Sequence, residues 1–145
     1  LENLAQSGES VGGRIRLLIQ NVPVGLGEPV FDKLKADLAH AMMSIGGVTT
    51  FSYGVGAAAA QMKGSEIIQD SQHFGGMEGG ISNGEEISLE LVFRPPSTIG
   101  TLAKNGRHDP TIVMRALPVV EAMAKMVLAD HFLRQQAYGE TKIED

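Results

Sequence analysis

The chain contains no cysteine and no tryptophan. The lack of cysteine excludes disulfide bonds, thiolate nucleophiles and zinc–thiolate centres, and it is compatible with a reducing compartment. No apolar run approaches the ~20 residues that a membrane-spanning helix needs, and no signal peptide is recognisable. We therefore expect a soluble, cytoplasmic protein with no membrane partner.

Positive charge is also scarce, with 12 Lys and Arg against 17 Asp and Glu and a net charge of −5. Without a segregated basic patch such a surface does not attract nucleic acid, so no nucleic-acid partner is expected. The 145 residues and the hydrophobic fraction of 43% suit one globular domain that can bury a core. Because the first residue is Leu1, we expect the sequence to be part of a longer polypeptide.

Alternating apolar residues predict three strands, over residues 14–22, 48–53 and 87–93. In the last of these the side chains expected to face inward are Ile87, Leu89, Leu91 and Phe93. Helical spacing of apolar residues predicts a helix that Pro29 opens and that ends at Gly46 and Gly47. Strands and helices in this order indicate an α+β fold.

A second helix is predicted from Pro110 to about Ala137, with a length of ~40 Å at 1.5 Å per residue. Its apolar positions cover more of the circumference than a single stripe would. Such a helix is usually buried on more than one side. We therefore predict long central helices sandwiched between antiparallel β-sheets.

Two glycine motifs match known signatures only in part. GESVG at residues 8–12 fits the G-x-S-x-G elbow of hydrolases, but a predicted strand follows the serine where the elbow needs a helix. GVGAAA at residues 54–59 fits a dinucleotide fingerprint, but Gly64 ends the segment early and no parallel βαβ unit surrounds it. The four histidines show no metal-ligand spacing, so no metal site is expected.

Three polar segments remain as candidates for binding an anion: GGISNGE at 79–85, RPPSTI at 94–99 and RHD at 107–109. Each lies at the end of an expected element, where backbone N–H groups are free. Asp109 is expected to be the N-cap of the last helix, with Pro110 at its first position and Arg107 close by. A helix N-terminus beside a guanidinium suits a phosphate or carboxylate, although a capped surface helix is the simpler interpretation of RHDP alone. Together the three segments predict a phosphorylated ligand.

With these segments, the sequence resembles the C-terminal part of the chorismate synthases. The resemblance is carried by VPVGLGEPVFDKL, by MSI followed by two small residues, by GGISNGE, by Pro-Ser-Thr at 96–98, and by GRHDP followed by RALPVVEAM. These matches run in order from about residue 8 to residue 134. The resemblance implies that residues 1–145 are the C-terminal portion of such a domain and that its N-terminal half lies outside this sequence.

The resemblance implies a carbon–oxygen lyase of the shikimate pathway, which serves aromatic amino acid biosynthesis. Such enzymes convert 5-enolpyruvylshikimate-3-phosphate into chorismate and phosphate by a 1,4-anti elimination. The implied cofactor is reduced FMN, with NADPH as a candidate reductant, and the implied assembly is a homotetramer of a β-α-β sandwich. The N-terminal half of the family supplies two histidines and several arginines of the active site, so the 145-residue chain alone is expected to be inactive. A non-catalytic flavin-binding or interaction module that keeps the fold is the alternative.

Motif matching assigns roles to individual residues. The implied flavin-binding positions are Gly46, Gly47, Gly79, Arg94, Pro95, Pro96, Ser97, Thr98 and Arg107. Arg107 is also implied to bind the anionic substrate, and Asp109 falls on the aspartate implicated in removing the C6 proton. The sequence departs from the family where arginine replaces the usual lysine at position 94, which keeps the charge but changes the donor geometry. The loops within residues 65–75 and 99–106 are shorter than is usual in the family.

Overall fold

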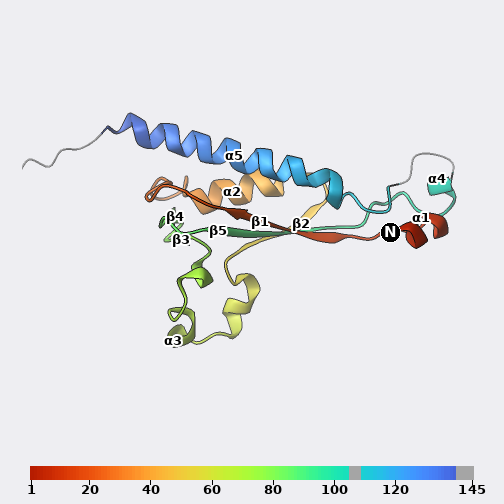
Figure 1. Cartoon of the computed structure of the whole chain (residues 1–145), viewed down its shortest axis with the longest axis horizontal. Coiled ribbons are helices and arrows are strands. Elements are labelled where there is room, and N and C mark those ends of the chain that lie inside the picture. The colour runs from red at the N-terminus through yellow and green to blue at the C-terminus, as the bar shows by residue number, and fades with distance from the viewer. Residues whose placement is uncertain (105–108, 140–145) are drawn as a thin grey trace, which may run out of the picture.

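The computed structural model describes residues 1–104 and 109–139 (Figure 1). In chain order its elements are α1 (Glu2–Ser7), β1 (Gly13–Ile19), α2 (Leu34–Met43), β2 (Val48–Tyr53), η1 (Gly56–Gln61), α3 (Gly64–Ile67), η2 (Ser71–Phe74), β3 (Met77–Glu78), β4 (Ile81–Ser82), β5 (Ile87–Phe93), α4 (Thr101–Lys104) and α5 (Val113–Ala137), where η marks a 3₁₀ helix. The predicted α+β class is confirmed. No helix in the described ranges is long and apolar enough to cross a membrane.

The main sheet is antiparallel, with strand order β1-β5-β2. Gly13 pairs with Phe93 and Ile19 with Ile87, while β2 joins the other side of β5 with Val48 opposite Phe93. The four side chains of β5 that were predicted to face inward are all buried: Ile87, Leu89, Leu91 and Phe93. A strand paired on both sides, with its apolar face beneath helices, forms the centre of the core.

Helices α2 and α5 cover one face of this sheet, with α2 against β2 and α5 against β1. Figure 1 shows both helices on one side of the sheet, and the excursion that carries η1, α3 and η2 on the other. The two helices also pack on each other. They bury Leu34, Leu38 and Met42 from α2, and Ala116, Val120, Ala124 and His131 from α5.

Helix α5 also carries large apolar side chains outside its buried stripe. Six large hydrophobic side chains of this helix are exposed: Met114, Leu117, Val119, Met126, Phe132 and Leu133. This number of exposed apolar side chains is unusual on a helix that faces only water. The apolar positions of α5 thus extend beyond its buried stripe, as the sequence predicted, and the described residues leave these six exposed.

Helix α2 does not begin at Pro29, contrary to the sequence-based prediction, but at Leu34. The preceding residues form a turn in which the Glu28 N–H donates to the Asp32 carbonyl at 2.9 Å. Within this turn Val30 has a φ of 69°, which no right-handed helix allows. Val30 and Phe31 are exposed, so their helix-like spacing does not reflect burial.

Helix α5 likewise begins later than predicted, at Val113, and its N-cap is Ile112. The prediction that Asp109 is the N-cap and Pro110 the first helical residue is therefore wrong. The reason is a tertiary hydrogen bond in which the Val11 N–H donates to the Pro110 carbonyl at 2.8 Å. This bond holds Pro110 against the N-terminal segment, outside the helix.

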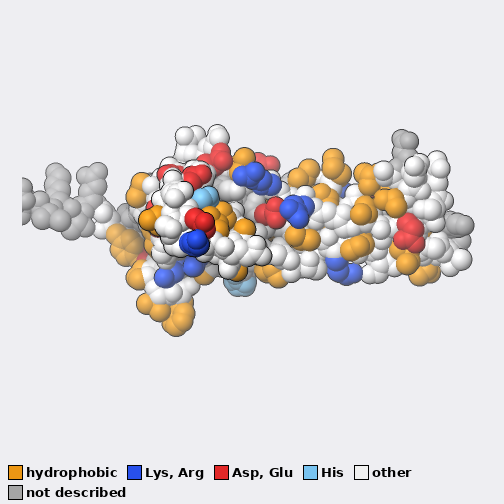
Figure 2. Space-filling view, turned by 90° about the horizontal axis from the view of Figure 1, so that it is seen from below, with side chains coloured by type: hydrophobic (Ala, Val, Ile, Leu, Met, Phe, Trp, Pro, Cys, Tyr) orange, Lys and Arg blue, Asp and Glu red, His pale blue; other side chains and the backbone are white. Residues whose placement is uncertain are grey.

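The face opposite the helices carries a mixture of side chains. Figure 2, seen from below, shows hydrophobic groups interspersed with charges of both signs, and Lys and Arg do not gather into one patch on this face.

Candidate functional site

One end of the main sheet brings together two of the segments that the sequence singled out. Because Val48 pairs with Phe93, the residues just before β2 lie beside those just after β5. The Arg94 N–H donates to the Gly47 carbonyl at 2.9 Å. The turn between α2 and β2, which contains Gly46 and Gly47, is thus joined directly to the 94–98 segment.

The N-terminal end of α5 reaches the same place. Gly47 has a φ of 90°, and a Cβ atom on it would lie 2.8 Å from Cδ1 of Ile112, the N-cap residue. A side chain at position 47 would therefore be strained by this φ, and it would push aside the end of the Ile112 side chain. Glycine permits the close approach of the helix end to the turn.

The 94–98 segment presents polar groups to solvent. Arg94 is exposed, and its Nη1 donates to the Ser97 Oγ at 2.9 Å. Thr98 and Gly46 are exposed, whereas Pro96 and Gly47 are half-buried. A guanidinium, two hydroxyl groups and a glycine turn form a donor set that fits a phosphate or another anionic group.

Asp109 is half-buried near the start of α5. Its Oδ2 accepts a hydrogen bond from Nη1 of Arg115, in the first turn of the helix, at 2.6 Å. Arg115 was not among the residues predicted from sequence, although an arginine in the first helical turn after RHDP could have indicated it. Arg107 and His108 lie outside the described residues, so the predicted contacts of Arg107 with flavin and substrate remain predictions.

Gly79 does not join the other predicted site residues within this chain. It lies in the exposed turn between β3 and β4. This hairpin adjoins the first residue of β5, since Gly76 packs against Glu86 and Ile87. Arg94 follows the last residue of β5, about 20 Å away along a seven-residue strand. The flavin contact of Gly79 therefore remains a prediction.

The two partial glycine motifs have structural roles. After Gly54 the chain enters a 3₁₀ helix, and β2 pairs antiparallel to its neighbour, which is not the parallel unit of a dinucleotide fold. The residues of GESVG lead into β1, which is the strand expected in place of the helix of a hydrolase elbow. Among residues 1–104 and 109–139 no three His, Asp or Glu side chains are grouped so as to hold a metal ion.

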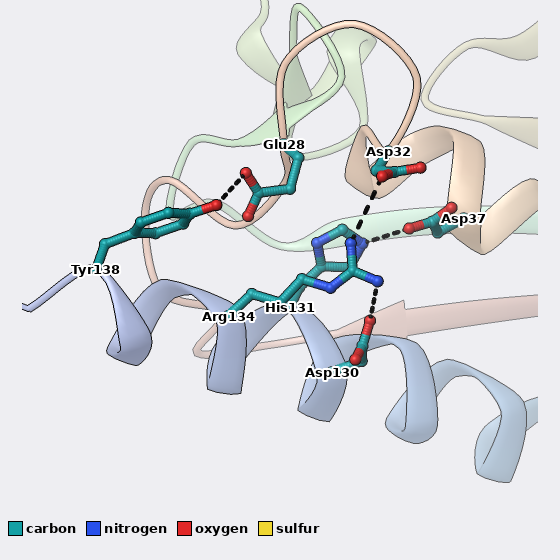
Figure 3. A network of polar contacts seen from close by, with 7 residues as sticks. All are labelled: Glu28, Asp32, Asp37, Asp130, His131, Arg134 and Tyr138. Atoms are coloured by element: carbon teal, nitrogen blue, oxygen red, sulfur yellow. Dashed lines mark hydrogen bonds and ion pairs between the residues drawn. The ribbon is translucent and has the colours of Figure 1, made fainter.

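A second polar cluster lies at the far end of α5 (Figure 3). The side chain of His131 is fully buried, and its Nε2 lies 2.9 Å from Oδ2 of Asp37 on α2. The other ring nitrogen, Nδ1, is buried without a hydrogen-bond partner. This residue therefore links the two helices mainly by packing and by one hydrogen bond.

Exposed pairs surround this link. Arg134 lies 2.8 Å from Asp130 and 3.8 Å from Asp32. The Tyr138 hydroxyl donates to Glu28 at 2.8 Å. This hydrogen bond raises the pKa of Tyr138, because ionisation would place a second negative charge beside the Glu28 carboxylate. None of the predicted site residues that the structure describes belongs to this cluster. We interpret the cluster as a set of contacts that hold α5 against α2 and the 22–33 loop.

We expect His131→Ala to lower the free energy of unfolding by about 3 kcal/mol, since it leaves a cavity in the core and removes the hydrogen bond. His131→Leu should cost under about 1 kcal/mol, because it fills the space and removes the unpartnered Nδ1, while the partly exposed Asp37 can be solvated by water. Urea unfolding of the two variants and the parent measures both values. Equal losses in both variants would show that the Asp37 hydrogen bond, not packing, carries the contribution.

These observations define an α+β chain in which segments suited to an anion meet at one end of an antiparallel sheet. The family model of chorismate synthase matches residues 1–133. The chain belongs to the chorismate synthase family.

Individual relatives agree with this assignment. The chorismate synthase of Bdellovibrio bacteriovorus is 52% identical over 134 residues, covering 92% of this chain and 39% of the relative. That of Synechocystis is 42% identical over 166 residues, covering 97% and 46%. A solved structure, "Crystal Structure of Chorismate Synthase", superposes with a TM-score of 0.75 at 31% identity, covering 92% of this chain and 41% of that one. The chain thus spans less than half the length of these relatives.

The lengths of these alignments show whether the relatives share the short loops of this chain. The match to the Synechocystis enzyme extends over 166 residues, more than the 145 of this chain, so the relative carries insertions. The match to the B. bacteriovorus enzyme extends over 134 residues for 92% of this chain and needs almost no insertion. The short loops are therefore shared with a relative of the same family.

Proposed function

We propose that this chain is the C-terminal part of a chorismate synthase. The complete protein converts 5-enolpyruvylshikimate-3-phosphate into chorismate and phosphate. In this elimination a proton leaves C6, the phosphate departs with the electron pair of its C–O bond, and the ring gains a second double bond without net redox change. The observation that carries the proposal is the meeting of Gly47, Arg94 and the start of α5 at one end of the sheet.

The flavin is assigned to the turn before β2 and to the segment after β5, that is, to Gly46, Gly47, Arg94, Pro95, Pro96, Ser97 and Thr98. The guanidinium and the two hydroxyl groups fit an anionic ligand, and the glycine turn lets a flat ring approach the backbone. Reduced FMN is an electron-rich group that supports departure of the phosphate when it is bound. Gly79 and Arg107 complete the proposed flavin-binding set.

Asp109 is the proposed proton acceptor. A positioned carboxylate can act as a general base, and the resemblance to the family, not basicity alone, selects Asp109 over its neighbour His108. The 2.6 Å contact with Arg115 orients Oδ2. Arg107 is proposed to bind the anionic substrate.

The complete protein has further parts. We propose that the rest of the family's chain covers the exposed apolar side chains of α5, so that the helices lie between two sheets. This fits the six exposed apolar side chains of the helix and the longer chains of the relatives. A homotetramer, NADPH as the source of reducing equivalents and a cytoplasmic location belong to the same proposal.

A non-catalytic flavin-binding module is the competing function. Short loops and the lack of the N-terminal half in this sequence would favour it. A relative that bears the name chorismate synthase aligns with almost no insertion, so the loops do not favour a loss of activity.

The test is a titration of the complete protein with FMN, with and without the phosphorylated substrate. We expect the substrate to tighten FMN binding about 5-fold or more, because two ligands in one pocket each exclude water from the other. Fluorescence or calorimetry measures both affinities, and formation of chorismate with reduced FMN measures turnover. Equal FMN affinities in the two titrations would contradict a shared pocket.

A further inference from the structure

The glycine-rich segment at residues 8–13 contacts the proposed flavin-binding segment from the side. The Ser10 Oγ donates to the Pro96 carbonyl at 2.7 Å, and this bond is partly buried. Two residues earlier, the Gly8 carbonyl accepts from the Gly100 N–H at 2.8 Å. The two bonds hold residues 94–100 at two points beyond the end of β5.

The same segment also contacts the start of α5. The Val11 N–H donates to the Pro110 carbonyl at 2.8 Å. A Cβ atom on Gly13 would lie 2.6 Å from Cγ2 of Val113, the first residue of the helix. The 8–13 segment therefore bridges the two parts of the proposed site, one that binds the flavin and one that carries Asp109.

Close packing explains the glycines of this segment. A Cβ atom on Gly12 would overlap the Phe93 carbonyl oxygen and would come within 3.3 Å of Cδ of Pro95. Such overlap with backbone cannot be relieved by a side-chain rotation. The backbone of the segment thus lies directly on the chain that leaves β5.

The two prolines after β5 limit how the main sheet can hold this segment. Pro95 and Pro96 have no N–H group, so these two residues cannot extend the sheet by donating to a neighbouring strand. The Pro96 carbonyl can still accept, and the Ser10 hydroxyl supplies the donor. This bond fixes the residues directly before the exposed hydroxyl groups of Ser97 and Thr98.

We propose that Ser10 is a positioning residue for the flavin-binding segment, and that the 8–13 segment sets the relative positions of the flavin-binding loop and the start of α5. This inference rests on the proposed function, in which residues 94–98 hold the flavin. A binding loop that is ordered before the ligand arrives loses less conformational freedom on binding. The Ser10 hydroxyl therefore acts on ligand affinity more than on global stability.

The test uses the complete protein and three variants. Ser10→Ala removes the hydroxyl, Ser10→Thr keeps it, and Ser7→Ala is the matched control, because Ser7 Oγ also donates to a backbone carbonyl, that of Leu4, at 3.0 Å. FMN affinity and the melting temperature are measured for each. We expect Ser10→Ala to weaken FMN binding about 5- to 10-fold with a melting temperature within a few degrees of the parent, which is the effect of one lost hydrogen bond on a preformed site.

Ser10→Thr should bind FMN within about 2-fold of the parent, and Ser7→Ala should match it. An unchanged affinity in Ser10→Ala would overturn the inference while leaving the proposed function intact. An equal loss in Ser10→Thr would also overturn it, since the hydroxyl would not then be responsible. A parent protein that fails to bind FMN would instead overturn the proposed function, and the inference with it.

Discussion

Asp109→Asn in the complete protein should lower turnover about 10²-fold or more, the usual contribution of a positioned general base. Asparagine has nearly the same shape as aspartate and can still accept a hydrogen bond from Arg115, but it cannot take up the C6 proton. Steady-state formation of chorismate with reduced FMN measures the effect.

Stability should change little in the same variant. Asp109 is not the N-cap of α5, so no capping contribution is lost. Its pair with Arg115 is partly exposed on both sides and contributes under about 1 kcal/mol. The melting temperature should therefore stay within a few degrees of the parent.

Arg115→Gln is the matched comparison. It removes the charged partner and keeps the carboxylate, so turnover should fall much less, by about 10-fold at most. If Asp109→Asn turned over like the parent, the carboxylate would have no role in proton removal. If both variants lost activity equally, orientation by Arg115 would matter as much as the base itself.

Two of the three strands could be predicted closely from sequence. The predicted ranges 48–53 and 87–93 agree with β2 and β5, whereas the predicted strand 14–22 ends at Ile19. The apolar residues of β5 alternate and are buried, β2 starts directly after a glycine pair, and β5 stops before a proline pair. Signals of this kind lie within a few residues of the element that they define.

The helix starts could not be predicted in the same way. Pro29 and Pro110 both stand where helix statistics favour proline, yet both lie in loops. At Pro29 a turn closed by Glu28 and Asp32 intervenes, and at Pro110 a hydrogen bond from Val11 does so. Val11 lies about one hundred residues from Pro110 in the chain, so no local sequence pattern can predict this hydrogen bond.

The sequence predicts a candidate site as a set of residues, whose roles stay predictions, but it does not predict how these residues are arranged. The motifs pointed to Gly47, Arg94 and Asp109, whereas the bond between Gly47 and Arg94 depends on the register of β2 against β5. The link between His131 and Asp37 joins residues 94 positions apart and is equally invisible to periodicity. Ser10 was considered only as part of a hydrolase motif, because its partner Pro96 becomes its neighbour only in the folded chain.

The 145-residue chain alone, supplied with reduced FMN and substrate, should release no phosphate above background. The elimination needs a base for the C6 proton and separately placed groups for the departing phosphate. This chain contributes one candidate carboxylate, Asp109, with its neighbours Arg107 and His108, and the resemblance assigns two histidines and several arginines of the site to the N-terminal half of the family. The complete protein should release phosphate under the same conditions.

The exposed apolar side chains of α5 give this prediction a second physical basis. Six exposed apolar side chains should make the isolated chain self-associate, because their burial against another surface is favourable. Such contacts would cover the helix with the wrong partner and would leave the site open to water. Phosphate release is therefore measured on material whose secondary structure and oligomeric state are determined in parallel, with the Asp109→Asn form of the complete protein as the baseline. Release by the 145-residue chain well above that baseline would show that the groups at the end of this sheet are sufficient for the elimination, and that the rest of the family's chain serves only to cover α5.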